Sequence, residues 1–144
     1  MTNCWTPTLV EERLVEAASV MKRLPNVRGP GCVSAWPKML LEFADLVEQE
    51  PSPLKAARPS PDAITRMEET LNWLRWLQPD DSKLVWSRAE RTPWKPICWR
   101  FGISRATAHR RWQYGLSVIA LRLNGRSVPA KRSRSFVVEG ARRL

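Results

Sequence analysis

Apolar residues between positions 105 and 123 recur at the spacing of one face of an α-helix. The steps are four, four, three and four residues, at positions Ala108, Trp112, Leu116, Ile119 and Leu123. The opposite, polar side carries Ala106, Arg110, Gln113 and Ser117, flanked by Thr107, Arg111 and Tyr114. The pattern therefore predicts a long helix with one buried stripe, and we expect Trp112 to be buried against Ile97 and Phe101 of the segment before it.

Capping signals predict a second, shorter helix directly before the long one. Thr92 is a suitable N-cap, with Pro93 at the first helical position. Gly102 supplies the left-handed residue that ends this helix, and Ser104 can cap the helix that follows. Residues 92–125 thus read as a short helix, a three-residue turn and a long basic helix.

The rest of the chain also shows helical signals and no strand of useful length, so we predict an all-α fold. Thr6-Pro7 and Ser60-Pro61 each place a capping residue before a proline, and further helices are expected at about Trp36–Glu48 and Ser82–Arg91. Four prolines within 51–61 predict a semi-rigid connector. We therefore divide the chain into an N-terminal helical unit (1–50), a proline-rich connector (51–60), a helix-turn-helix unit (61–125) and a basic flexible tail (126–144).

Charge is distributed unevenly along the chain. Residues 91–144 hold thirteen Lys or Arg against the single acid Glu139, whereas residues 1–90 hold eleven against thirteen acids. A neutral segment joined to a strongly basic one is typical of a protein that binds nucleic acid phosphates. The same charge on a protein without such a ligand would be a solvated basic face, and the turn signature next to it favours nucleic acid.

Signals for catalysis, metal binding and membrane insertion are weak. His109 is the only histidine, and adjacent acids such as Glu68-Glu69 point in different directions on a helix. We therefore expect no enzyme, no metal site and no cofactor. Cys4, Cys32 and Cys98 are odd in number and widely spaced, which favours a reducing cytoplasm. No apolar run approaches the length of a membrane span, and the N-terminus does not resemble a signal peptide.

The segment WKPICWRFGISRATAHRR at 94–111 resembles the helix-turn-helix of sigma factors in the part that reads the −35 promoter element. Leu84–Arg91 is similar to the helix that packs beneath that motif. Trp5–Gly125 as a whole resembles a family of uncharacterised small proteins from alphaproteobacteria and their prophages, through WTP at 5–7, RMEETLNWLRWL at 66–77 and WKPICWRFGISRATAHRRWQYGL at 94–116. Arg111 departs from the sigma-factor pattern, because an aliphatic residue usually stands there.

The resemblance implies that the long helix, 105–123, enters the DNA major groove. Arginine suits bidentate contact with guanine, and hydroxyls suit phosphates or base edges. The residues expected at the DNA are Ser104, Arg105, Ala106, Thr107, Arg110, Arg111, Gln113 and Tyr114, with Lys95, Arg100 and the tail 131–134 on the backbone. The departure at position 111 leaves open whether Arg110 or Arg111 is the principal base reader.

Three functions remain compatible with the sequence. The first is a sequence-specific transcription regulator of a phage or prophage, with double-stranded DNA as partner and the N-terminal helices free to contact RNA polymerase or to form a homo-oligomer. The second is a DNA-packaging subunit similar to a small terminase, although such subunits usually carry the reading helix at the N-terminus. The third is a non-catalytic protein-interaction module with a basic tail.

Overall fold

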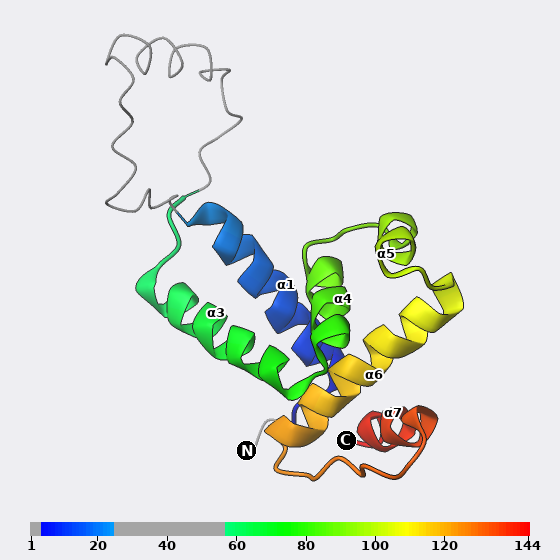
Figure 1. The fold of residues 1–144 in the computed structure, drawn as a ribbon. Helices are drawn as coiled ribbons and strands as arrows, with labels where there is room; N and C mark the ends of the chain where they lie inside the picture. The colour runs from blue at the N-terminus through cyan, green and yellow to red at the C-terminus, as the bar shows by residue number, and fades with distance from the viewer. Residues whose placement is uncertain (1–3, 25–56) are drawn as a thin grey trace, which may run out of the picture. The chain divides into compact units, whose positions relative to one another are not determined.

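A computed structural model describes residues 4–24 and 57–144, and every regular element in these two ranges is helical (Figure 1). The elements are α1 (Pro7–Arg23), α3 (Pro61–Trp73), the 3-10 helix η1 (Leu74–Trp76), α4 (Pro79–Ala89), α5 (Trp94–Phe101), α6 (Arg105–Leu123) and α7 (Arg134–Arg142). The predicted all-α fold is confirmed for this part of the chain. The helix expected at Trp36–Glu48 lies outside the described residues. No described helix is both long and apolar enough to cross a membrane.

Local capping signals set where most of these helices begin. The backbone N–H of Ala63 donates to the Ser60 hydroxyl at 3.2 Å, so α3 starts where the serine-proline pair predicts. Helix α4 begins at Pro79, three residues before the predicted start, because a proline loses no hydrogen bond in the first turn. Helix α5 begins at Trp94 with Pro93 as its N-cap, so the expected cap at Thr92 is wrong. The Thr92 carbonyl instead accepts a hydrogen bond from the Arg88 guanidinium at 2.8 Å.

The main core lies where α6 passes α1, α3 and α4 (Figure 1). Its buried members are Val10, Leu14, Ala18, Trp73, Val85, Ala89, Leu116, Ile119 and Ala120. The start of α1 is also tied to the end of α6 by a reciprocal pair of hydrogen bonds. The Trp5 N–H donates to Asn124 Oδ1 at 2.8 Å, and Asn124 Nδ2 donates to the Trp5 carbonyl at 2.7 Å.

This packing differs from the division of the chain expected from the sequence. Among the described residues, α1 and the residues from Pro59 to Leu144 form one compact unit. Helix α1 belongs to it because its apolar face, Val10, Leu14 and Ala18, is buried in the same core as α6. The first helix of the expected N-terminal unit 1–50 thus packs with the C-terminal helices, while the rest of that unit and most of the expected connector 51–60 lie outside the described residues.

The expected flexible tail 126–144 contains an ordered helix. Helix α7 is capped by Ser133, whose hydroxyl accepts from the Phe136 N–H at 3.4 Å. Val137 and Ala141, one turn apart, are buried against Val118 and Leu121 of α6. The sequence prediction missed α7 because its apolar stripe is short and is surrounded by arginines.

Helices α4 and α6 approach each other closely at Gly115, which has no Cβ to keep them apart. A Cβ built on Gly115 would lie 2.8 Å from Val85 Cγ2 and 3.4 Å from Leu77 Cδ1. Val85 is fully buried and β-branched, so its side chain has few alternative positions. Gly140 in α7 offers the opposite environment, because nothing lies within 4 Å of its Cβ position.

We predict that Gly115→Ala lowers the free energy of unfolding by about 1 kcal/mol, although alanine forms helices better than glycine. Overpacking a core costs about 1–3 kcal/mol and outweighs a propensity gain of about 1 kcal/mol. The control Gly140→Ala should raise the free energy of unfolding by about 0.5–1 kcal/mol. Urea unfolding followed by circular dichroism measures both, and stabilisation by Gly115→Ala would contradict the close approach of the two helices.

Candidate nucleic-acid interface

The turn between α5 and α6 is built by a glycine and a capping serine. Gly102 adopts a left-handed conformation, with φ of 62°, and the next N–H, of Ile103, donates to the Cys98 carbonyl at 3.2 Å. The Ser104 hydroxyl accepts from the Thr107 N–H at 3.2 Å and donates to Thr107 Oγ1 at 2.9 Å. These contacts fix the direction in which α6 leaves the turn.

A small second core holds the start of α6 in place from one side. Leu84, Ile97 and Ala108 are buried there, with Phe101 and Trp112 packed against them. Trp112 therefore packs against this part of the preceding helix as expected, but it is only partly buried rather than fully buried. The Trp112 ring also meets the Trp94 ring edge-to-face, with centroids 5.8 Å apart. Helices α4 and α5 therefore pack against one side of the first turns of α6.

The other side of these turns is open to solvent. Arg105, Ala106 and Arg110 are exposed, and Gln113 is half-buried. They line a shallow hollow together with Trp94 and His109. We call Arg105, Ala106, Arg110 and Gln113 the open face of α6. Among the described residues neither arginine of this face has a carboxylate within 4.0 Å.

Arg111 lies in a different environment from Arg110, a distinction that the sequence analysis left open. Its Nε lies 3.8 Å from Oδ1 of Asp81 on α4, and the exposed fractions of the two side chains are 29% and 5%. Arg111 thus points back toward the supporting helix and supplies the ionic partner of a buried carboxylate. Arg111 therefore lies on the side of α6 that faces α4, and it is not part of the open face.

Tyr114 is also placed differently from the sequence expectation. It packs against the cluster of Val118, Leu121 and Val137, and the guanidinium carbon of Arg134 lies 5.2 Å from the centre of its ring. Helix α7 therefore covers this part of α6, and the open face ends near Gln113.

Helix α5 adds basic and aromatic side chains on its outer surface. Lys95 and Arg100 are both exposed, and the Arg100 guanidinium reaches the Ser87 hydroxyl at 3.5 Å. Trp99 is 84% exposed, whereas Trp73 is buried. Trp99 is exposed because it lies on the side of α5 away from Ile97, the buried residue of this helix.

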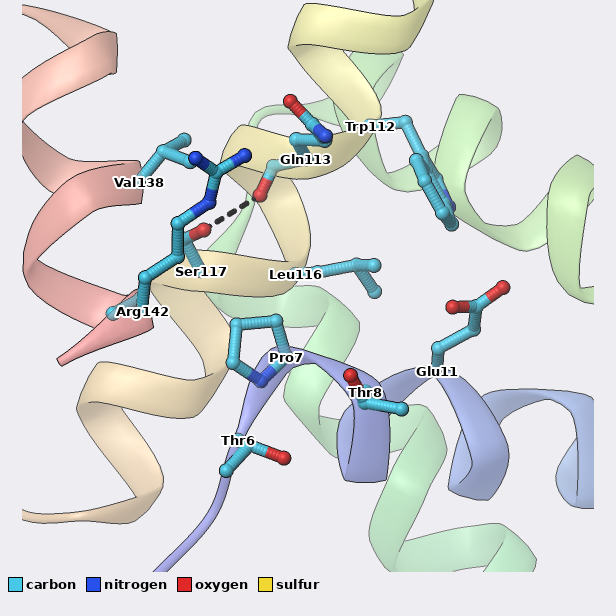
Figure 2. Close-up of a pocket in the computed structure, with 11 residues that line it drawn as sticks. Thr6, Pro7, Thr8, Glu11, Trp112, Gln113, Leu116, Ser117, Val138 and Arg142 are labelled. Carbon is cyan, nitrogen blue, oxygen red and sulfur yellow. Dashed lines mark hydrogen bonds between the residues drawn. The ribbon is translucent and has the colours of Figure 1, made fainter. Parts of the chain in front are cut away.

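Two hollows border α7. The first, of about 480 Å³, lies between α6 and α7 and is lined by Thr107, Arg110, Gln113, Arg134, Ser135, Val138, Glu139 and Arg142. The second, of about 330 Å³, lies among α1, α6 and α7. Figure 2 shows Leu116 at its centre, Glu11 pointing toward Trp112, and Arg142 extending along α6 toward Gln113. Neither hollow was predictable from the sequence, because both depend on the docking of α7.

Comparison with protein families gives one match. The profile of the family described as "Domain of unknown function (DUF6362)" matches residues 22–119, more than half of the chain. The chain belongs to this family. The DUF6362 match includes α3, α4, α5 and most of α6, and it contains every residue of the open face; it does not reach α7. Comparison with curated proteins and with solved structures gave no match.

The different settings of the two adjacent arginines predict different effects on stability. Arg111→Met should lower the free energy of unfolding by about 1–3 kcal/mol, because Asp81 would remain buried without its ionic partner. Arg110→Met should change it by less than about 0.5 kcal/mol, as is usual for an exposed side chain. Thermal and urea unfolding of both variants test this, and equal effects at the two positions would contradict the assignment of Arg111 to the core side.

Proposed function

We propose that the chain is a sequence-specific double-stranded DNA-binding protein in which α5 and α6 act as a helix-turn-helix. The observation that carries this proposal is the open face of α6. Its two arginines have no carboxylate partner within the described part of the chain, and the opposite side of the helix packs against α4 and α5. An α-helix with its side chains is about 10–12 Å wide and fits a major groove about 12 Å wide. Preorganised arginines on such a helix suit base recognition.

Each residue of the open face has a chemistry that suits one kind of contact. Arg110 is placed to donate two hydrogen bonds to guanine, and Gln113 can pair with adenine in the same way. Ala106 offers an apolar contact to a thymine methyl group. Arg105 lies at the start of α6, where recognition helices contact base edges or phosphates. Because Arg111 is paired with Asp81, Arg110 is the base reader of the two.

Residues beside the open face suit phosphate contacts. Lys95 and Arg100 are exposed on α5, the helix that crosses the backbone in proteins of this architecture. Their contacts would position the protein without reading sequence. Ser104 and Thr107 already share their hydroxyls in the cap of α6, so we assign them mainly to the orientation of the helix.

The resemblance to the promoter-reading part of sigma factors supports a role in transcription regulation, in a phage or prophage setting. RNA polymerase and a second copy of the chain are the proteins that such a regulator would contact. The proposal is tested by selecting bound fragments from a random double-stranded DNA library with the purified full chain. Enrichment of a short common sequence supports it, and recovery of unenriched fragments would contradict sequence-specific binding.

We predict that Arg110→Ala weakens binding to the selected sequence by about 1–3 kcal/mol and relaxes the preference for one base pair. Arg122→Ala is the matched control, because Arg122 is exposed near the other end of the same helix and has the same charge. It should leave the base preference unchanged. Fluorescence anisotropy on the selected site and on a scrambled site separates the two effects, and equal losses on both DNAs would assign Arg110 to a phosphate instead.

A further inference from the structure

We infer that α7 is a second, ordered contact to the DNA backbone, which holds Arg134 beside the open face of α6. This inference rests on the proposed function and extends it to a helix outside the DUF6362 match. It replaces the flexible basic tail expected from the sequence with a contact whose position is fixed by packing.

The docking of α7 is specified by apolar contacts. Val137 and Ala141 are 2% and 1% exposed, and both pack on Val118 and Leu121 of α6. These four residues are one apolar cluster, so the start of α7 cannot move away from α6 without exposing it. Helix α7 therefore presents its first turn at a defined place on α6.

Arg134 stands at that first turn and is itself oriented. Its guanidinium carbon lies 5.2 Å from the centre of the Tyr114 ring, a cation–π arrangement that restricts the side chain. The side chain is exposed, and within the described residues it has no carboxylate within 4.0 Å. Arg134 and Ser135 share a hollow with Arg110 and Gln113. A restrained, exposed arginine without an acidic partner suits a phosphate.

The position of this hollow favours DNA as the ligand. Arg110 and Gln113 border two hollows. One of these hollows is also lined by Trp94 of α5, and the other is also lined by Arg134 of α7. The open face therefore has α5 on one flank and α7 on the other (Figure 1), and α5 carries the exposed Lys95. A helix in a major groove is bordered by two phosphate backbones, and a cation on each flank matches that arrangement.

Arg143, directly after the other end of α7, does not share these properties. Arg143 lies 3.7 Å from Glu139, so its charge is partly compensated, and it lines neither hollow beside α7. It provides a matched control, because Arg134 and Arg143 lie on or directly beside the same helix and carry the same charge.

The first experiment measures DNA affinity against salt concentration for the full chain and two variants. Arg134→Ala should lower the slope of log K against log salt by about 0.9 and weaken binding about tenfold near 0.1 M salt, equally on selected and scrambled DNA. Arg143→Ala should leave the slope unchanged. A slope for Arg134→Ala equal to that of the wild type would overturn the inference while leaving the proposed function intact. Absence of salt-dependent DNA binding by the wild type would overturn both.

The second experiment separates an ordered contact from a flexible tail. Val137→Asn keeps every basic residue but weakens the docking of α7, and it should reduce the affinity by about as much as Arg134→Ala. Unchanged affinity would show that the tail acts through its charge alone, and tighter binding would show that α7 covers the DNA-binding face; either result overturns the inference. Circular dichroism verifies that the remaining helices stay folded, and Arg134→Ala, a surface change, gives an independent answer if they do not.

Discussion

The close crossing of α4 and α6 determines where the open face lies. At Gly115 the two helices approach so closely that a single methyl group would meet Val85. One turn earlier on α6, Arg111 reaches across the same crossing to Asp81. These two contacts set the rotation of α6 about its axis, and the rotation decides which arginine faces solvent. A different rotation would bring Arg111 outward and turn Arg110 toward the core.

Features that depend on neighbouring residues were predictable from the sequence, whereas those that depend on distant residues were not. Gly102 marks where α5 ends and Ser104 marks where α6 begins, because capping is decided within a few residues. The apolar stripe of α6 predicted the contact of Trp112 with α5 in the same way. The partner of Arg111 lies on another helix, and no local pattern distinguishes an arginine that pairs with a buried acid from one that stays free.

The same limit applies to the ends of the chain. Helix α1 joins the C-terminal helices through its apolar face and through the hydrogen bonds between Trp5 and Asn124, which are far apart in sequence. Val137 and Ala141 are the buried residues through which α7 docks, and so short an apolar stripe is a weak signal in the sequence. The many arginines around these two residues suggested a solvated tail instead. Helix α7 also lies outside the family match, whereas the open face lies within it.

Hydrogen exchange with and without the selected DNA tests most directly whether the open face of α6 binds DNA. The exposed turn and the first turns of α6, residues 102–113, should exchange more slowly in the complex, because DNA would cover them. The amides of α3, whose outer face lies on a different part of the same unit, should exchange at the same rate in both states. Protection confined to α1 or α3, with residues 102–113 unchanged, would contradict DNA binding through α6.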